Sequence, residues 1–117
     1  MKVKIYGARE SMKTVQHAEG TAQTVDTLLE VNGSPMIAYA DMAANEQGSY
    51  IYAAENVEGD KAAVAFTEGG AVYYDAGNDV FTNTDNTGAN KLCGIAKEAA
   101  AGGDATVVID FNASLGL

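Results

Sequence analysis

The 117-residue chain has no tryptophan and only one proline, one cysteine and one histidine. With Cys93 as the single cysteine, no intrachain disulfide can form, so the chain can fold in a reducing compartment. One histidine and one cysteine cannot supply the nitrogen and sulfur ligands of a structural zinc site. No apolar run is long enough to cross a bilayer, and the first residues turn polar before a signal-peptide core forms. These absences predict a soluble protein without a membrane partner, made in the cytoplasm.

Basic residues are also few: seven Lys and Arg stand against sixteen Asp and Glu, giving a net charge of −9. Phosphate binding needs clustered positive charge, so this balance argues against a nucleic acid partner. The first 13 residues, however, hold four basic residues and one acidic residue, a balance of +3 that leaves −12 for the remainder. This division has two interpretations of equal weight: an N-terminal segment that lies on another surface, or a frayed terminus of solvated lysines.

Catalytic and nucleotide-binding motifs are absent as well. The glycine pairs Gly69-Gly70 and Gly102-Gly103 lack the following lysine of a phosphate-binding loop. His17 lies in a segment without regular periodicity, which favours a solvent-exposed role over a catalytic one. Apolar neighbours of Cys93 favour a buried, inert thiol. We therefore predict no catalytic residue and no cofactor, and the chain is not expected to be an enzyme.

One loop is rich in oxygen-bearing side chains that suit calcium. It lacks the ordered spacing of a helix-loop-helix calcium site. Asp and Asn side chains also form turns by bonding their own backbone, and this interpretation is favoured over a metal site. The residues concerned are Asp75, Asn78, Asp79, Asn83, Asp85 and Asn86.

What the chain does contain is a series of short β-branched and aromatic runs bounded by Gly, Asn and Asp. Residues 71–74 and 80–82 flank one such cluster and predict a hairpin. In the segment 106–111, Val107, Ile109 and Phe111 alternate with other residues, so one face of a strand is consistently apolar. Further strands are expected at residues 2–6, 36–40, 50–52, 63–66 and 91–96, with a polar turn at 55–61 and an irregular segment at 7–23. Residues 24–31 are compatible with a short helix or a strand, and the strand is favoured.

This spacing of short strands predicts a mainly β fold. The chain length allows a single domain, which we expect to be a small β-barrel or β-sandwich of short antiparallel strands with an extended N-terminal arm. We assign residues 1–23 to the arm, 24–112 to the β domain and 113–117 to a C-terminal tail. In the tail, Leu115 and Leu117 are candidates for docking on a partner.

The order of features from residue 31 to residue 112 resembles the capsid cement or decoration proteins of tailed phages, the DUF2190 family. The matching pattern begins with a glycine before Val-Tyr-Tyr-Asp, an Asp/Gly/Asn turn and Val-Phe-Thr. It continues with Leu-Cys-Gly-Ile-Ala, an alanine-rich connection from Lys97 to Ala101, and a Gly-Asp turn into the final Val/Ile strand. These are backbone motifs, turns and strand edges, with no chemically unique side chain.

The resemblance implies a structural, non-enzymatic protein that binds the outer surface of the assembled phage head and stabilises it against internal DNA pressure. It implies the major capsid protein as partner, and a homotrimer at three-fold or quasi-three-fold positions of the virion. Many weak, identical contacts on a symmetric shell are consistent with such a role, because they give avidity without a single tight site.

The charge division and strand alternation, rather than the resemblance, direct the search for partner-binding residues to the N-terminus. The run from Lys2 to Tyr6 alternates in the manner of a half-covered edge strand. We predict that the segment from Met1 to Lys13 extends onto the shell or a neighbouring subunit by strand addition. The predicted partner-binding residues are Val3, Ile5, Tyr6, Arg9 and Lys13.

A carbohydrate- or cell-surface-binding β module is the alternative. Five tyrosines are possible stacking platforms for a sugar ring: Tyr39, Tyr50, Tyr52, Tyr73 and Tyr74. Because Tyr73 and Tyr74 are adjacent, they point to opposite faces of a strand. We therefore expect one of these two in the core and only the other to be available to a ligand.

Overall fold

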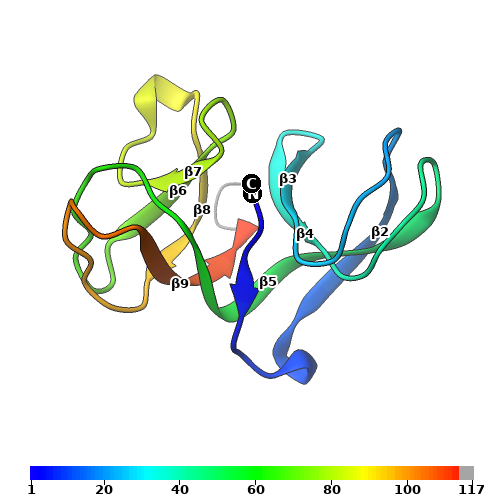
Figure 1. The fold of residues 1–117 in the computed structure, drawn as a ribbon, viewed down its shortest axis with the longest axis horizontal. Coiled ribbons are helices and arrows are strands. Elements are labelled where there is room, and N and C mark those ends of the chain that lie inside the picture. Colours follow the sequence, from blue (N-terminus) through cyan, green and yellow to red (C-terminus); the bar gives the residue numbers. More distant parts are fainter. Residues whose placement is uncertain (114–117) are drawn as a thin grey trace.

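The computed structural model describes residues 1–113, and the residues Leu115 and Leu117 lie outside the described part. Figure 1 shows two halves of the molecule joined by the long strand β5 (Gln47–Asp60). The shorter strands are β1 (Lys4–Ile5), β2 (Lys13–Ala18), β3 (Leu28–Val31), β4 (Ser34–Ala38), β6 (Ala71–Asp75), β7 (Val80–Thr82), β8 (Lys91–Ala96) and β9 (Thr106–Asn112). Two 3-10 turns complete the elements, η1 (Arg9–Ser11) and η2 (Asn86–Gly88). No helix in residues 1–113 has the length and apolarity needed to cross a membrane.

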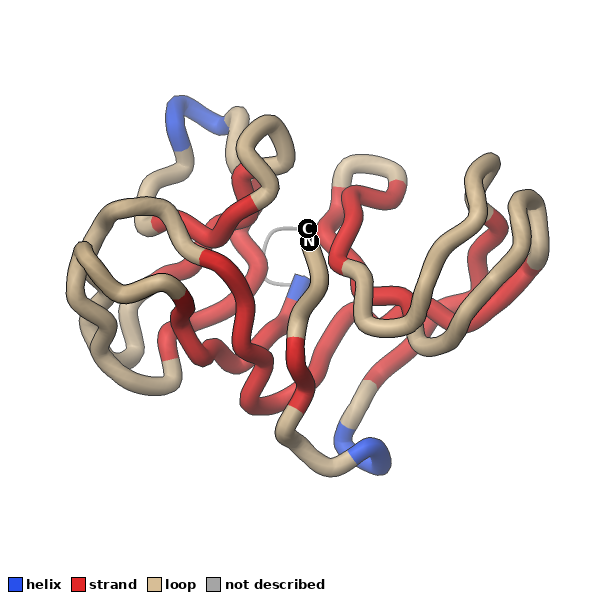
Figure 2. Tube along the Cα trace, in the orientation of Figure 1, coloured by secondary structure: helices blue, strands red, loops and turns tan. Residues whose placement is uncertain are grey.

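Within residues 1–113, nine strands form one antiparallel sheet in the order β3-β4-β5-β9-β8-β6-β7, and β1 and β2 pair with β5 outside this path. The sheet curls into a half-barrel. Figure 2 shows strands in both halves of the molecule, and β5 connects the two sets. The mainly β, antiparallel fold is thus confirmed. Of the two expected architectures, barrel or sandwich, the single curled sheet is closer to a barrel that remains open.

The length of β5 corrects the expected polar turn at residues 55–61. The strand continues through Asp60. The irregularity within this stretch is a β-bulge, not a turn. At this bulge Asn56 has a φ of 53°, and the pairing with β9 shifts register between Ala54 and Val57. A bulge of this kind bends a strand and keeps its pairing on either side, so Val57 remains fully buried. The polar residues of this stretch lie mainly on the exposed side of the pleat.

The N-terminal segment is folded along β5. Both β1 and β2 pair with β5, and residues 7–12, including η1, bridge the gap between them. This connection passes so close to β5 that a Cβ at Gly7 would lie 2.4 Å from the carbonyl oxygen of Glu55. The extended arm is therefore not confirmed, and the irregular conformation expected for residues 7–23 is wrong for β2. The boundaries between arm, domain and tail stay predictions.

The C-terminal strands match expectation more closely. The hairpin of β6 and β7 is confirmed, as are β8 and β9, and in β9 the residues Val107, Ile109 and Phe111 are buried. The strand expected at 63–66 is wrong, since this segment contributes one isolated bridge, from Phe66 to Ala100. In place of the expected strand pairing, the segment makes a tight turn, in which the amide of Val64 donates to the carbonyl of Ala62.

The buried apolar residues form two clusters. The large cluster contains 17 buried residues among the described part of the chain, with Phe81 and Phe111 among the largest. The small cluster consists of Val31, Ala38, Met42 and Tyr50. Neighbouring residues divide between them: Ile37 and Ile51 belong to the large cluster, whereas the adjacent Ala38 and Tyr50 belong to the small one. Because successive residues of a strand point to opposite faces, β4 and β5 carry a core on each face.

Candidate functional site

The predicted partner-binding residues divide between the core and the surface. Val3 is 4% exposed and belongs to the large cluster, against which Ile5 also packs. Tyr6, in contrast, is 63% exposed, and Arg9 and Lys13 are exposed as well. The structure therefore presents Tyr6, Arg9 and Lys13 to solvent, while Val3 and Ile5 hold the segment to the body.

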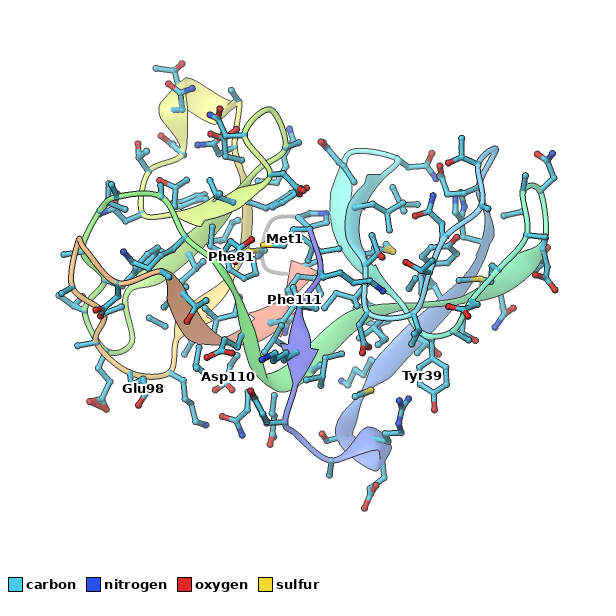
Figure 3. All side chains as sticks on the ribbon, in the orientation of Figure 1. Met1, Tyr39, Phe81, Glu98, Asp110 and Phe111 are labelled. Atoms are coloured by element: carbon cyan, nitrogen blue, oxygen red, sulfur yellow. The ribbon has the colours of Figure 1, made fainter. Side chains whose placement is uncertain are left out.

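The exposed N-terminal side chains contact neighbours on the surface. The guanidinium carbon of Arg9 lies 4.8 Å from the ring centroid of Tyr39, within cation–π range. The Tyr39 ring points outward at the margin of the molecule in Figure 3. The hydroxyl of Tyr6 donates to Glu58 over 3.4 Å, a long hydrogen bond. These contacts place two exposed residues of the N-terminal segment against side chains from later in the chain, Tyr39 and the acidic Glu58.

Strand β2 is the feature of this surface that the sequence did not reveal. It pairs with β5 on one side, and five of its six residues are exposed, including Val15 at 38%. Because neither face is buried, no apolar alternation marks it in the sequence. Within residues 1–113, no strand, bridge or backbone hydrogen bond covers its other edge.

The two ends of the main sheet are covered by other parts of the chain. At β3 the amide of Leu28 donates to the carbonyl of Met1 at 2.8 Å, and at β7 the carbonyl of Phe81 accepts from Ala62 at 2.8 Å. Backbone groups at a sheet edge are open to pairing with another chain unless something covers them. The edge of β2 is open in this sense.

At the far end of β2, His17 closes the small cluster. Its Nε2 lies 2.8 Å from an oxygen of Glu19, and its ring packs edge-on against Tyr50 at 5.4 Å between centroids. Tyr50 is fully buried, and its hydroxyl has no hydrogen-bond partner among the described residues. Burial, followed by the charge of Glu19, raises the pKa of Tyr50. His17 is thus partly buried, in place of the solvent-exposed position expected, and its contacts are those of a packing residue.

The loop rich in Asp and Asn bonds largely to itself. One carboxylate oxygen of Asp75 accepts from the backbone amide of Asn78 at 3.2 Å, and the other accepts from the side-chain amide of Asn78 at 2.7 Å. These hydrogen bonds lower the pKa of Asp75. Asp85 accepts from the amide of Thr87. These are the turn hydrogen bonds that the sequence favours. In residues 1–113, no three His, Cys, Asp or Glu side chains gather closely enough to hold a metal ion.

Asp79 has a different role, because it links distant segments. Its carboxylate accepts from the Tyr74 hydroxyl and lies 2.8 Å from the α-amino group of Met1, which also donates to the carbonyl of Leu28. Burial favours a raised pKa for Asp79, but hydrogen bonds from the α-amino group and Tyr74 outweigh it and lower the pKa. Met1 lies between the two halves of the molecule in Figure 3, so this ion pair ties the β6–β7 turn to β3.

Two further expectations concern buried side chains. Cys93 is fully buried, and burial raises the pKa of its thiol far above the usual range, as expected for an inert thiol. Of the adjacent tyrosines, Tyr74 is in the large cluster, whereas Tyr73 lines a surface hollow of about 280 Å³ together with Thr67 and Asn83. The predicted division of Tyr73 and Tyr74 between ligand-accessible surface and core is confirmed.

These features define a small antiparallel β protein whose distinctive feature, among the described residues, is an open strand edge beside exposed N-terminal side chains. Comparison with family models makes this class specific, because the model described as phage cement protein matches residues 8–111. The chain belongs to this family. No curated protein and no solved structure matches the chain at a significant level. The protein therefore has a structural role at the phage capsid, and the resemblance of residues 31–112 to phage cement proteins is confirmed, whereas the DUF2190 label stays a prediction.

Proposed function

We propose that the protein is a non-enzymatic cement protein that binds the outer surface of the assembled head through the major capsid protein and stabilises the shell. It acts as a homotrimer at three-fold or quasi-three-fold positions after synthesis in the host cytoplasm. The observation that carries the proposal is the match of the cement family to residues 8–111, nearly the whole chain.

The charge of the chain supports an outer rather than an inner position. A net charge of −9 repels packaged DNA, which is itself densely negative. Within the head, every copy would have to lie against this polyanion. On the outer surface the protein does not face this polyanion, and its negative charge favours solubility before assembly.

The size of the chain allows both a trimer contact and a shell contact. A standard protein interface buries roughly 800 Å² on each partner. Each subunit of a cyclic trimer has two neighbours, so with the shell it makes three such contacts, which bury about 2400 Å² of its surface. The accessible surface of the protein is 5844 Å², so more than half of it stays in solvent. Repetition of a modest contact over a symmetric shell, and within each trimer, raises the overall avidity.

We assign the shell contact to the N-terminal surface. Tyr6, Arg9 and Lys13 are exposed there and are the members of the predicted set that a partner can reach. Val3 and Ile5 contribute by anchoring this segment to the large cluster and to the side chains packed around it. The aromatic ring and two cations suit a partner surface that carries carboxylates beside an apolar patch.

Co-sedimentation of the purified protein with expanded, undecorated heads tests the proposed function. We expect saturable binding, with a number of copies per shell that is a multiple of three, and a raised temperature of head disruption. Absence of binding across salt concentrations and maturation states contradicts the proposal.

A matched pair of variants tests the assigned surface. The double variant Arg9→Ala, Lys13→Ala removes two positive charges there, and the control Lys91→Ala, Lys97→Ala removes the same charge elsewhere. Each control lysine is exposed, and the only ion pair lost is that of Lys97 with Asp110, which is worth little at the surface. We expect the first variant to lose at least tenfold in affinity for heads and the second to bind like the wild type.

The hollow beside Tyr73 favours carbohydrate binding as a second candidate function. An aromatic ring with a nearby hydroxyl and amide, here Thr67 and Asn83, is suited to stacking and hydrogen bonding with a sugar. Titration with a panel of bacterial surface saccharides, followed by NMR, tests this function. Shifts confined to the hollow and lost in Tyr73→Ala support it, and an unresponsive spectrum contradicts it.

A further inference from the structure

The open edge of β2 presents specific backbone groups, and one hydrogen bond identifies them. On the β4 side of β5, the amide of Tyr39 donates to the carbonyl of Ser49 at 3.1 Å. In an antiparallel sheet the amide and carbonyl of one residue point to the same edge, and those of the next residue point to the opposite edge. Gly48 and Tyr50 therefore direct their backbone groups away from β4, toward β2.

The register of β2 then determines which of its residues face outward. His17 and Val15 lie opposite Gly48 and Tyr50, and so exchange hydrogen bonds with β5. Thr14 and Gln16 alternate with them and direct their N–H and C=O groups to the open side. These four groups are spaced as a ladder for an incoming antiparallel or parallel strand.

The protection that natural sheet edges carry is largely missing from β2. Such edges are usually shortened, covered, or interrupted by proline, bulges or inward-pointing charges. β2 is six residues long, contains no proline, and has its one lysine, Lys13, at the first position. Its only register shift lies at that same end, between Lys13 and Thr14. The stretch 14–18 is regularly paired and, apart from the partly buried His17, exposed, and it carries no Asp, Glu, Lys or Arg. This is the geometry that strand addition uses.

The surroundings of this edge favour a partner over a second copy of the chain. Pairing of one β2 with another about a two-fold axis would close a dimer, which does not fit the proposed three-fold position. Arg9 and Lys13 lie exposed in η1 and at the start of β2, with one exposed acidic residue, Glu10, between them. The start of the edge therefore keeps an excess of one positive charge, and a strand that arrives here with carboxylates gains favourable contacts.

We propose that the open edge of β2 accepts an extended, acidic segment of the capsid shell protein, which pairs with the outward backbone groups of Thr14 and Gln16. This inference rests on the proposed function. It reverses the direction of strand addition expected from the sequence: the N-terminal segment is already part of the sheet, and the shell supplies the new strand.

Two proline variants with matched controls test the proposal by co-sedimentation with undecorated heads. Gln16→Pro and Thr14→Pro each remove an outward N–H and block the ladder, but neither removes a hydrogen bond to β5. Gln16→Ala and Thr14→Ala keep the N–H, and Gln16→Ala also controls for the loss of the side-chain bond to Ser49. We expect the alanine variants to bind like the wild type and the proline variants to lose at least tenfold in affinity, with unchanged melting temperatures.

Hydrogen exchange of the wild-type protein supplies a test that needs no variant. In the free protein the amides of Thr14 and Gln16 should exchange fast and those of Val15 and His17 slowly. On heads, the two fast amides should become protected while the others stay as they were.

The outcomes separate the two proposals. If the wild type does not bind heads, the proposed function is wrong, and the edge proposal is overturned with it. If the wild type binds and the proline variants bind equally well, or the amides of Thr14 and Gln16 stay unprotected on heads, only the edge proposal is wrong. If a proline variant abolishes self-association in the absence of heads, measured by sedimentation equilibrium, a second copy occupies the edge and the shell strand is excluded.

Discussion

The large and small clusters share strands but differ in how completely they are built. The large cluster joins 17 buried residues of the described chain, and the hydroxyl of its Tyr74 is bonded to Asp79. The small cluster joins four, and the hydroxyl of its Tyr50 is buried without a partner. A buried polar group without a partner lowers stability by about 1 to 3 kcal/mol. One face of the sheet is therefore a satisfied core, and the other is a thinner one with a polar defect.

This difference separates the part of the fold that maintains stability from the part that is proposed to bind a partner. β9 and the second half of β5 pack on the large cluster, whereas β2 is backed by Tyr50 of the small cluster through His17. Regions with few buried contacts open locally at a lower free energy than the whole protein unfolds. The edge proposed to receive a shell strand thus lies on the more adaptable side of the molecule.

The largest expected effect comes from removing a central side chain of each cluster. Phe111→Ala should lower the free energy of unfolding by about 3 to 5 kcal/mol, because it leaves a cavity among well-packed neighbours. Met42→Ala in the small cluster should lower the free energy of unfolding by about 2 kcal/mol or less, the low end for truncation of a buried methionine. The loss is smaller because Met42 is 7% exposed and neighbouring side chains can move into the space. Urea unfolding of both variants measures the contrast. Equal losses would show that the two clusters are equivalent.

The same substitution made in each cluster should act in opposite directions. Tyr74→Phe removes the hydroxyl that donates to Asp79 and should destabilise the protein by about 1 kcal/mol. Tyr50→Phe removes a hydroxyl without a partner and should stabilise it by a similar amount, about 1 kcal/mol. Thermal unfolding of the two variants beside the wild type is the measurement. A loss of stability in Tyr50→Phe would mean that this hydroxyl is satisfied in solution.

A smaller effect, dependent on pH, is expected at the ion pair beside the large cluster. Asp79 has a lower pKa in the folded than in the unfolded chain, so its charge stabilises the fold above a pH of about 4 and this contribution is lost as the pH falls through the folded pKa. Asp79→Asn should lower stability at pH 7 by at most about 1 kcal/mol, because the side chain is half exposed and screened. Urea midpoints measured between pH 7 and pH 3 should converge for the variant and the wild type. A constant difference would assign the effect to packing.

The smallest effect is expected at the end of β2. His17→Ala removes a partly buried hydrogen-bond contact with Glu19 and an edge-on ring contact with Tyr50, so global stability should fall by about 0.5 kcal/mol. The amide of Val15, bonded to β5, should nevertheless exchange faster, because β2 loses its support from the small cluster. Residue-resolved hydrogen exchange tests this, and unchanged rates would show that pairing with β5 alone holds β2.

The sequence predicted strands such as β9, whose apolar residues alternate regularly, and missed β2 and the second half of β5, where no such alternation is present. Val107, Ile109 and Phe111 alternate with less apolar neighbours, so the pattern reports their burial directly. β2 has no buried face and therefore no pattern. Residues 55–60 are mostly polar and appeared as a turn, but pairing with β1 and β9 overrides that local preference.

The candidate surface was predicted in composition but not in conformation. The excess of basic residues at the N-terminus is a property of the sequence, and Tyr6, Arg9 and Lys13 are indeed exposed. That the same segment bonds to β5 and leaves an edge open depends on pairs such as Lys4 with Glu58 and Val15 with Tyr50. Contacts between residues so far apart in the chain leave no local signal.

The long strand β5 also determines how the molecule responds to a pull. It runs through both halves and pairs with β2 and β4 near its start and with β1 and β9 near its end. Hydrogen bonds of an antiparallel ladder lie perpendicular to the strands, so tension along β5 loads many of them in shear at once, instead of opening them one after another. The protein should therefore resist a force along β5 more strongly than a force across it. This property would be useful if two contacts of the protein with an expanding shell moved apart along this direction.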